Sequence, residues 1–483
     1  MLKSPSIHSK KRRKIQGWSL CVSDLFSFLL SVVIASFVSV MVSIRNNGYS
    51  SGITATNLNV IALLTLVWIL WMGLMHRRYI RRTSFWNELR ETLQGVMVFS
   101  LFHLAVMKIF HQQINIAWWL ITWLFIATLI PLLRQWTKRI LLQLNLWQIP
   151  TIIIGDGENA RKACLALKSE KIANFDVQGF ISKRHLNGSR VAAPVSGIPL
   201  LCMSDQGCSV NSFAGFHSVI ALESNESSES EAWVRQLTLA GAEDIFVIPP
   251  MQGIPLYGME IKHFFTHEAL VIRLHNNLSH CSSKVVKRWF DIIASSLLLF
   301  LLSPILALLV WKITRDSGPA IFGHMRVGQN RRLFKCLKFR TMVWNADSVL
   351  AELLDSDSEA RAEWEQCFKL KNDPRITCIG NFLRKTSLDE LPQLWNVLKG
   401  EMSLVGPRPV VVDELKNYGN DVEYYLMAKP GMTGIWQISG RNDVDYDTRV
   451  KMDSWYVKNW SLWSDIVIIL KTIPVVFGRN GAY

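Results

Sequence analysis

The first third of the chain contains four long apolar runs separated by polar loops. They cover residues 18–44, 57–75, 94–110 and 116–133. Each run approaches the ~20 residues that a helix needs to cross the hydrocarbon core of a bilayer, although the third and fourth are short. We therefore predict a transmembrane bundle of four helices within residues 1–145. The competing interpretation treats the shorter runs as buried helices of a soluble domain.

Basic residues flank these runs unevenly. They precede the first run, fill the loop between the second and third, and follow the fourth: Lys10–Lys14, Arg77–Arg90 and Arg134–Arg139. The two other loops, at residues 46–57 and 111–115, carry almost no basic charge. Because Lys and Arg are enriched in cytoplasmic loops, the pattern predicts a cytoplasmic N-terminus and a cytoplasmic location for the chain after Arg134.

From Thr151 onward, short β-branched runs alternate with amphipathic stretches. Strands are predicted at residues 151–155, 176–182, 217–222 and 244–250, and helices at residues 159–170 and 227–240. Strands and helices that alternate in this way form a parallel sheet covered by the helices. The pattern therefore predicts a Rossmann-like α/β domain over residues 148–255.

The first strand-to-helix turn of this domain reads Gly155-Asp-Gly157-Glu-Asn-Ala160. It fits the dinucleotide-binding fingerprint, with Ala in the third place. That fold places an acid after the second strand for a ribose hydroxyl, but Ser182 and Lys183 stand there. We therefore interpret the domain as a regulatory or dimerising module, with nucleotide binding as the alternative.

A fifth apolar segment covers residues 289–311 and differs from the first four. Lys and Arg flank it on both sides, and Ser303-Pro304 interrupts it. Proline removes a backbone donor and kinks a helix, whereas a serine hydroxyl can satisfy the freed carbonyl. These features predict a re-entrant helix over residues 286–312 that enters and leaves the membrane on the cytoplasmic side. The alternative, a fifth full span, would place the chain after Lys312 outside the cell.

Beyond this segment, cations occur in settings that suit phosphate binding. Lys338 and Arg340 lie two residues apart on one side of an extended stretch. Arg408 stands between Pro407 and Pro409, each of which fixes its own φ and drives the preceding residue into extended geometry. A guanidinium on so stiff a segment can bind phosphate oxygens with little ordering cost.

Two adjacent carboxylates, Asp389 and Glu390, follow Arg384 and Ser387. Ser387 and Glu390 have the spacing of a capping box, which predicts a helix that begins here with both acids in its first turn. The helix dipole favours acids at that position in any protein. With the surrounding cations, however, the pair suits phosphoryl transfer, with one carboxylate as nucleophile at phosphorus and the other holding Mg²⁺ or moving a proton.

Composition narrows the class of protein. The 483 residues carry 53 Lys and Arg against 38 Asp and Glu, a formal net charge of +15, yet 49% are hydrophobic. So high a hydrophobic fraction excludes a disordered or fibrous chain. The 8 Cys form no C-x-x-C pair and no zinc-type cluster, which disfavours a disulfide scaffold and a zinc module. Among the 19 Trp, Trp455, Trp460 and Trp463 lead into an apolar stretch at residues 466–477, which predicts an interfacial helix or, alternatively, a core helix.

Taken together and in order, these motifs resemble one family. The stretch from Lys284 to Tyr483 resembles the bacterial monotopic phosphoglycosyl transferases, also called polyprenyl glycosylphosphotransferases. The matching motifs are Ser303-Pro304, Lys338–Met342, Ser387–Leu394, Gly406–Pro409, Lys429–Gly434 and Gly440–Asn442. The bundle and the Rossmann-like domain resemble the long subfamily. The implied fold class is a membrane α-helical bundle, an α/β Rossmann-like domain and an α+β catalytic domain over residues 282–483 that contains the re-entrant helix.

The resemblance implies an undecaprenyl-phosphate hexose-1-phosphate transferase. Its reaction converts a UDP-hexose and undecaprenyl phosphate to undecaprenyl-diphosphate-hexose and UMP, with Mg²⁺ as cofactor, and initiates O-antigen, capsular or exopolysaccharide synthesis. Galactose is the expected hexose, although no motif distinguishes it from glucose. The implied location is the bacterial inner membrane, with the catalytic domain on the cytoplasmic face. The expected partners are the two substrates, membrane lipids and a second copy in a homodimer, and no nucleic acid.

The resemblance also implies residue roles. Asp389 is the expected nucleophile, which forms a covalent phosphosugar-aspartate, Glu390 is the neighbouring acid, and both are candidate Mg²⁺ ligands. Six side chains are expected to bind phosphate or substrate: Lys338, Arg340, Arg384, Arg408, Arg441 and Asp453. The spaced acids from Asp443 to Asp447 resemble a metal-binding run, although such acids are usually solvated.

Two other classes of protein fit parts of the chain. A membrane-anchored NAD-dependent dehydratase or epimerase would need the missing acid of the Rossmann-like domain and a helical Tyr/Lys pair. Tyr425 and Lys429 have the right spacing, but Pro430 breaks such a helix. A non-enzymatic scaffold that only binds a polyprenyl lipid would leave the carboxylate pair and the arginines without a purpose.

Overall fold

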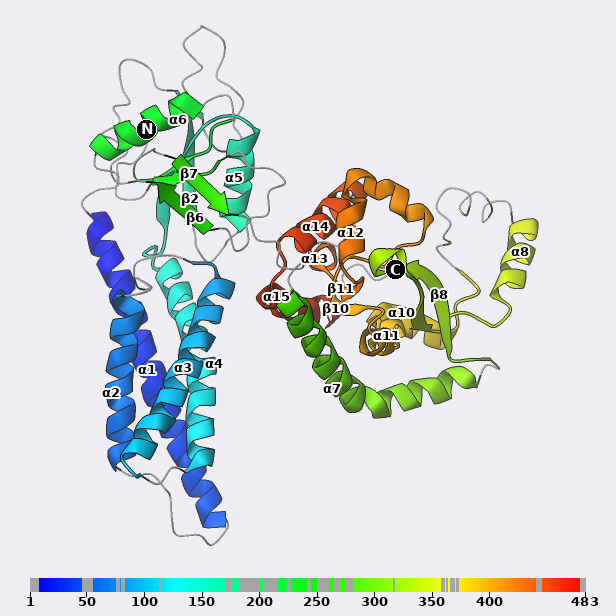
Figure 1. The fold of residues 1–483 in the computed structure, drawn as a ribbon, viewed down its shortest axis with the longest axis horizontal. Coiled ribbons are helices and arrows are strands. Elements are labelled where there is room, and N and C mark those ends of the chain that lie inside the picture. The colour runs from blue at the N-terminus through cyan, green and yellow to red at the C-terminus, as the bar shows by residue number, and fades with distance from the viewer. Residues whose placement is uncertain are drawn as a thin grey trace. The chain divides into compact units, whose positions relative to one another are not determined.

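The chain divides into two compact units, residues 1–251 and residues 252–483, in a computed structural model (Figure 1). The structure describes residues 8–45, 55–74, 79, 83–112, 115–169, 175–182, 198, 200–202, 216–223, 227–240, 245–249, 260–264, 269–273, 281–315, 318–357, 361, 364, 370, 373–439 and 445–477. The three-domain division expected from the sequence, with boundaries near residues 145, 255 and 282, stays a prediction.

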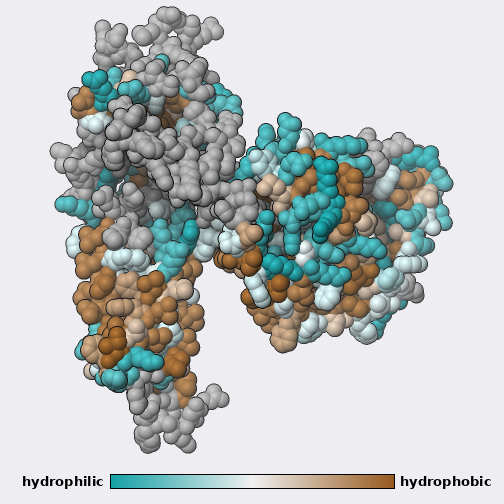
Figure 2. Space-filling model, in the orientation of Figure 1, coloured by the Kyte–Doolittle hydropathy of each residue, from teal (hydrophilic) through white to brown (hydrophobic). Residues whose placement is uncertain are grey.

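Four long helices open the first unit, as the apolar runs predicted. They are α1 (His8–Arg45), α2 (Ala55–Leu74), α3 (Phe85–Ile109) and α4 (Ile116–Gln143). All four are long and apolar enough to cross a membrane, and Figure 2 shows hydrophobic side chains over their outer surface. Inside the bundle, Phe28 packs edge to face against Trp68 and Trp123, with ring centroids 5.7 and 6.3 Å apart. The predicted basic loop at residues 77–82 lies, except for residue 79, outside the described residues.

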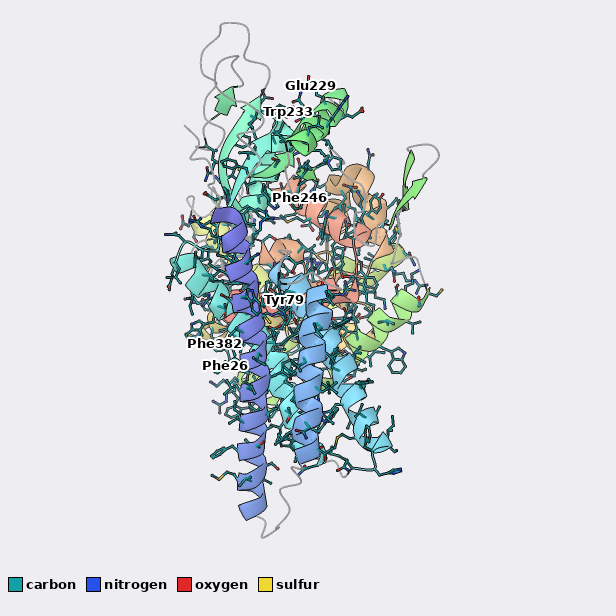
Figure 3. The ribbon with its side chains drawn as sticks, turned by 90° about the vertical axis from the view of Figure 1, so that its left-hand side faces the viewer. Phe26, Tyr79, Glu229, Trp233, Phe246 and Phe382 are labelled. Carbon is teal, nitrogen blue, oxygen red and sulfur yellow. The ribbon has the colours of Figure 1, made fainter. Side chains whose placement is uncertain are left out.

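A buried network of charges joins three of these helices. Arg134 of α4 donates to Asp24 of α1 and, at 3.0 Å, to Glu88 of α3, and Lys138 pairs with the same Glu88. The hydroxyl of Tyr79 (labelled in Figure 3) donates to Asp24 at 2.9 Å. The sequence pattern counted Arg134 and Lys138 among the flanking charges that indicate topology. The structure buries both, because each has an acidic partner inside the bundle that offsets its cost of desolvation.

The rest of the first unit is a five-stranded parallel sheet in the order β3-β2-β1-β4-β5. Its elements are β1 (Ile149–Ile154), α5 (Glu158–Ser169), β2 (Phe175–Ser182), β3 (Leu200–Cys202), β4 (His217–Ile220), α6 (Ser227–Leu239) and β5 (Ile245–Val247). Alternate side chains of β1 serve opposite faces, since Ile153 packs with Cys164 of α5 and Ile152 packs with Trp233 of α6 (Figure 3). The predicted alternation is confirmed. Strand β3 was missed because its three residues are too short to show a period.

The second unit contains two antiparallel hairpins, a parallel pair of short strands, one long helix and several short helices. The elements before the Asp389–Glu390 pair are β6 (Glu260–Phe264), β7 (Ala269–Arg273), α7 (Cys281–Thr314), β8 (Ile321–Val327), η4 (Gln329–Arg331), β9 (Leu333–Phe339) and α8 (Ala346–Ser356). Those that adjoin or follow this pair are α10 (Cys378–Thr386), η5 (Leu388–Glu390), α11 (Gln393–Lys399), β10 (Ser403–Val405), η6 (Asp413–Asp421), α12 (Val422–Met427), β11 (Gly431–Thr433), α13 (Ile435–Ile438), α14 (Tyr446–Lys458) and α15 (Leu462–Phe477). Trp460, before α15, is buried in the core, whereas Trp455 is exposed.

Helix α7 carries the Ser303-Pro304 break in its interior. Figure 1 shows its two arms with a bend between them. The Ser303 hydroxyl donates to the carbonyl of Phe300 at 2.8 Å, which is the carbonyl that an N–H at residue 304 would bond in a regular helix. The hydroxyl therefore satisfies the carbonyl that Pro304 leaves free, as the sequence predicted.

Both arms of α7 pack against the same unit. In the first arm, the ammonium of Lys287 donates to the carbonyl of Val405 at 3.0 Å. In the second arm, Ile313 is buried and its carbonyl accepts from the Arg340 guanidinium at 2.9 Å. A straight helix of 34 residues would separate its ends by about 50 Å, so the bend is what allows both ends to rest on one unit. Apolar side chains near the bend, such as Phe300, are exposed.

We expect thiols at the two ends of α7 to report the same side of the membrane. Cys281 is exposed at the start of α7, and Arg315→Cys places a thiol just after its end. In variants that keep one of these as the only cysteine, an impermeant maleimide should react with both from the same side of sealed vesicles. Pro304→Leu restores the missing N–H and is expected to straighten α7 and expose residue 315 on the other side. Labelling of the two unaltered ends from opposite sides would contradict the prediction.

Candidate active site

Asp389 and Glu390 lie together in the short 3₁₀ turn η5, between α10 and α11. Ser387 closes α10 in a left-handed conformation, with φ of 55°, and its N–H donates to the carbonyl of Arg384 at 3.2 Å. Its side chain makes no capping hydrogen bond to η5. The predicted capping hydrogen bond is therefore absent, although Ser387 does precede a helical turn that has both acids in its first turn, as predicted. Ser387 ends α10 and begins η5 at the same time.

Lys338 of β9 reaches both carboxylates, with its ammonium 2.8 Å from Glu390 Oε1 and 3.8 Å from Asp389 Oδ2. Burial raises the pKa of Asp389, Lys338 and Arg384 oppose that shift, and Glu390 adds to it. Burial lowers the pKa of Lys338, but the two carboxylates outweigh this effect and raise it overall. Lys338 therefore stays protonated and supports the ionised form of Asp389. The sequence pattern had assigned this support to a helix dipole, which a three-residue turn does not supply.

Asn396 of α11 fixes the distance between β9 and the carboxylates. Its amide oxygen accepts from the N–H of Leu337 at 3.0 Å, and its amide nitrogen donates to the carbonyl of Lys335 at 2.8 Å. Because α11 follows η5 directly, these two hydrogen bonds hold the acids beside the strand that carries Lys338. Asn396 is buried, and sequence motifs gave no sign of this role.

Arg340 lies apart from the carboxylates. Its side chain is 8% exposed, and it donates to the carbonyl of Ile313 in α7. A Cβ at Gly318 would lie 1.9 Å from the Arg340 guanidinium, so this glycine leaves room for it. Lys338 and Arg340 therefore have different partners: the N–H of Arg340 continues the hairpin by donating to the carbonyl of Ala320, whereas its guanidinium bonds to α7.

Arg408 and Asp453 lie together in a second cluster. The Arg408 guanidinium lies 5.5 Å from the ring centroid of Trp436, and Arg449 lies over the same ring at 5.1 Å. The hydroxyl of Tyr418 donates to Asp453 Oδ2 at 2.9 Å. Burial raises the pKa of Asp453 to about 7, against hydrogen bonds from Tyr418 and the backbone of Arg408. The five side chains line one pocket. Sequence reasoning missed Trp436 and Arg449, although Arg449 and Asp453 have the i, i+4 spacing of one helix face.

The backbone around Arg408 is rigid, as the flanking prolines predicted. The N–H of Gly406 donates to the carbonyl of Thr433 at 3.0 Å, and the carbonyl of Pro407 accepts from Gly431 at 2.8 Å. A Cβ at position 406 would lie 2.3 Å from the carbonyl of Lys429, so only glycine fits this close approach. Within the described residues, no hydrogen bond or ion pair joins Arg408 to Asp389 or Glu390.

The predicted ligands between Arg441 and Asp447 are only partly described by the structure. Arg441 and Asp443 fall outside the described residues, which resume at Asp445. Asp445 caps α14, where its side chain accepts from the N–H of Thr448 at 3.3 Å. In the part of the chain that the structure describes, no three His, Cys, Asp or Glu side chains group closely enough to hold a metal ion.

In the first unit, the dinucleotide-type fingerprint packs against the chain itself. Gly155 has a φ of 130°, and a Cβ there would lie 2.5 Å from the carbonyl of Ala221. A Cβ at Gly157 would lie 2.4 Å from Glu223 Oε1, and this same oxygen accepts from the N–H of Asn159 at 2.8 Å. In a dinucleotide-binding domain this helix N-terminus receives a phosphate. Here the Glu223 carboxylate takes that place.

The apolar helices indicate a membrane-associated protein, and its paired acids and cations suit a transferase that acts on phosphorylated substrates. The bacterial sugar transferase family matches residues 282–479. An undecaprenyl-phosphate galactose phosphotransferase of Salmonella typhimurium is 48% identical over 421 residues, 87% of either chain. A UDP-galactose-lipid carrier transferase of Erwinia amylovora is 46% identical over 470 residues, 96% of this chain and 97% of the relative. A UDP-glucose:undecaprenyl-phosphate glucose-1-phosphate transferase of Escherichia coli is 38% identical over 223 residues, 44% of this chain and 45% of the relative.

The chain therefore belongs to the bacterial sugar transferase family and is an enzyme. The first two relatives match most of the chain, including both units, and the third matches less than half of it.

Lys338→Met should shift the pH profile of turnover. Activity that needs ionised Asp389 rises with pH through the pKa of that group. Because Lys338 lowers this pKa, its removal raises the pKa and moves the acid limb to higher pH. At neutral pH we expect turnover to fall by roughly a hundredfold. Lys335→Met is the control, because Lys335 is an exposed cation on the same strand, and it should keep the wild-type profile. An unshifted acid limb in Lys338→Met would refute the claim that Lys338 lowers the pKa of Asp389.

Glu223→Ala should destabilise the first unit without creating a cofactor requirement. The lost carboxylate leaves the N–H of Asn159 without this acceptor at a helix start, at a cost of about 1 kcal/mol in the free energy of unfolding. Glu229→Ala, on the exposed side of α6, is the control (Figure 3). Thermal unfolding measures both, and a stabilising shift of wild type by NAD(H) would show that the glycine loop still accepts a dinucleotide.

Proposed function

We propose that the enzyme transfers a hexose 1-phosphate from a UDP-hexose to undecaprenyl phosphate, which gives undecaprenyl-diphosphate-hexose and UMP. The observation that carries the proposal is the Asp389–Glu390 pair held under Lys338 in the unit that also contains the apolar helix α7. Galactose is the proposed hexose, because the two relatives that match most of the chain are named for galactose. The product belongs to the lipid-linked sugars that begin O-antigen, capsular or exopolysaccharide synthesis.

The proposed mechanism has two displacements at one phosphorus atom. An ionised oxygen of Asp389 attacks the phosphorus that carries the hexose, an O–P bond forms, and the bond to the bridging oxygen breaks. UMP leaves with the electron pair of that bond. A phosphate oxygen of undecaprenyl phosphate then attacks the phosphosugar-aspartate, and the bond to Asp389 breaks, which restores the carboxylate.

The cations have separate tasks in this mechanism. Lys338 and Arg384 act at the nucleophile, where they favour the ionised carboxylate and offset the charge of the incoming phosphates. Arg408, fixed by its backbone, is a pre-oriented ligand for a phosphate oxygen. Arg441 is proposed to join them on the grounds of its motif alone.

Mg²⁺ is proposed as cofactor, and the residues fit it. Mg²⁺ is usually held by one or two carboxylates together with substrate phosphates and waters. Asp389 and Glu390 would supply the carboxylates of that donor set, and Lys338, which pairs with both, would compete with the ion for them. When bound with the substrate, the ion would neutralise phosphate charge and favour the departure of UMP.

The bend of α7 supports a re-entrant placement in the membrane. Both arms contact the rest of the second unit, and apolar side chains near the bend, such as Phe300, are exposed. We propose that α7 dips into the cytoplasmic leaflet of the inner membrane and returns, which brings the active site to the headgroup of the lipid substrate. Helices α1–α4 would span the same membrane. The homodimer expected from the sequence stays a prediction.

Asp389→Asn should abolish turnover, because it keeps the size of the side chain but removes the nucleophile. Wild-type enzyme should release UMP from UDP-galactose in a burst of about one equivalent without any lipid, and should show ping-pong kinetics with undecaprenyl phosphate. Glu390→Gln should slow turnover by roughly a hundredfold or more and keep a slow burst. The readouts are UMP release and product formation over a panel of UDP-sugars.

Asp413→Asn provides the matched control, because Asp413 is an exposed acid of the same unit. It should retain the wild-type burst and turnover. Sequential kinetics without a lipid-independent burst, together with substantial activity of Asp389→Asn, would leave direct transfer as the mechanism.

A further inference from the structure

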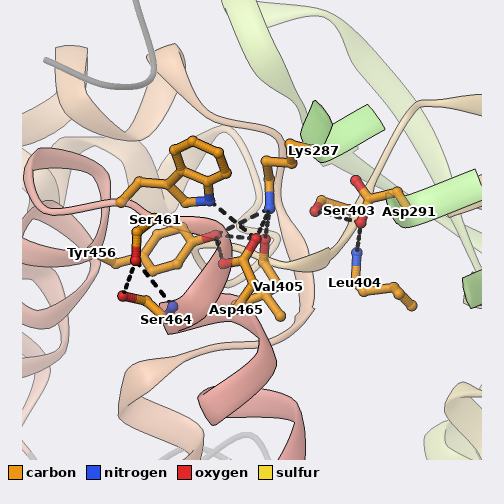
Figure 4. A network of polar contacts seen from close by, with 10 residues as sticks. Lys287, Asp291, Ser403, Leu404, Val405, Tyr456, Ser461, Ser464 and Asp465 are labelled. Atoms are coloured by element: carbon orange, nitrogen blue, oxygen red, sulfur yellow. Dashed lines mark hydrogen bonds and ion pairs between the residues drawn. The ribbon is translucent and has the colours of Figure 1, made fainter. Parts of the chain in front are cut away.

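Side chains from three helices of the second unit meet in one network, and two of them donate to the backbone carbonyl of Val405 (Figure 4). The ammonium of Lys287 in α7 donates to Asp465 Oδ2 at 2.7 Å and to the carbonyl of Val405 at 3.0 Å. The hydroxyl of Tyr456 lies 2.7 Å from Asp465 Oδ1 and 3.0 Å from the same carbonyl. Trp460 donates to Asp465 Oδ2 at 3.0 Å. All five residues are buried, so water does not replace these contacts.

The carbonyl at the centre of this network belongs to the peptide group that leads into the Arg408 segment. The carbonyl end of the Val405–Gly406 peptide is held by Lys287, and its N–H end donates to the carbonyl of Thr433. Only one residue, a proline with a fixed φ, then separates Gly406 from Arg408. A rotation of this peptide group would therefore be transmitted directly to the backbone of Arg408.

The same arm of α7 also holds the segment that follows the carboxylates. Arg288 donates to the carbonyls of Val397 and Leu398 at the end of α11, each at 2.6 Å. Asp291 accepts from the N–H of Leu404 at 3.1 Å. One arm of the apolar helix thus contacts both the element after Asp389 and the strand before Arg408.

In the sequence, Lys287 is one of the basic residues that flank the fifth apolar segment and indicate its side of the membrane. Its burial and its three acceptors show that it is also part of a network inside the unit. A buried ion pair is by itself weak evidence for stability. What distinguishes Lys287 is that it also donates to a backbone carbonyl at the start of a substrate-binding motif.

We propose that Lys287 is a positioning residue for phosphoryl transfer, which fixes the Val405–Gly406 peptide and thereby the place of Arg408. Asp465 and Tyr456 hold the ammonium in the required place. This inference rests on the proposed function, in which Arg408 binds a substrate phosphate.

The test compares a single variant with a charge-neutral double variant. Lys287→Met leaves the Asp465 carboxylate buried without its ammonium, so it should lower the thermal midpoint as well as turnover. Lys287→Met with Asp465→Asn removes both charges and should regain much of the thermal midpoint. Turnover of folded double variant should nevertheless stay roughly tenfold to a hundredfold below wild type, because the carbonyl of Val405 has lost its ammonium.

Hydrogen–deuterium exchange supplies a readout that does not depend on activity. The peptide over residues 403–408 should exchange faster in the double variant than in wild type. Lys284→Met, which removes an exposed cation from the same arm, should match wild type in turnover and exchange. Lys287→Arg keeps the buried charge, should fold, and should lose part of the turnover, so it serves as the second variant if the double variant does not fold.

If the folded double variant shows wild-type turnover or wild-type exchange, the proposal is overturned, and Lys287 serves only as the ion-pair partner of Asp465. The same results in Lys287→Arg would overturn it if only that variant folds. A wild-type enzyme that transfers no hexose phosphate would instead count against the proposed function. In that case the exchange of residues 403–408 still decides whether Lys287 fixes this segment.

Discussion

The architecture of the second unit depends on the bend of helix α7, which lets both of its arms pack against the rest of that unit. A regular helix of this length would carry its two ends far apart, but the proline break and the Ser303 hydroxyl permit a bend without an unsatisfied carbonyl. The first arm can then bury Lys287 against β10, and the second can bury Ile313 under Arg340. One arm contacts α11 and β10, which adjoin the acids and Arg408, and the other arm contacts Arg340, so α7 is part of the framework of the candidate site.

Much of the fold was predictable from periodicity, and the exceptions have physical causes. Long apolar runs and the β/α alternation have periods that are visible in the sequence, so the four helices and most of the parallel sheet were found. Pairing between distant residues has no such signal. Arg134 and Lys138 were taken as flanking charges because Asp24 and Glu88, their partners, lie far away in sequence.

The same distinction applies to the candidate site: the sequence shows its motifs, but it does not show which distant residues lie together. The motifs identified the acids and most of the cations, but not how they group. Arg340 belongs with α7, and Arg408 belongs with Trp436 and Asp453. The charge that favours the ionised form of Asp389 comes from the ammonium of Lys338 on a neighbouring strand and not from a helix terminus, and that pairing appears only when β9 is placed beside η5.

Mass spectrometry of the protein after incubation with UDP-galactose, without lipid acceptor, tests the central claim most directly. The mechanism predicts that the intact protein gains the mass of one hexose phosphate, that fragmentation places it on Asp389, and that undecaprenyl phosphate removes it. An unmodified protein, or a modification on another residue while turnover continues, would contradict the covalent mechanism.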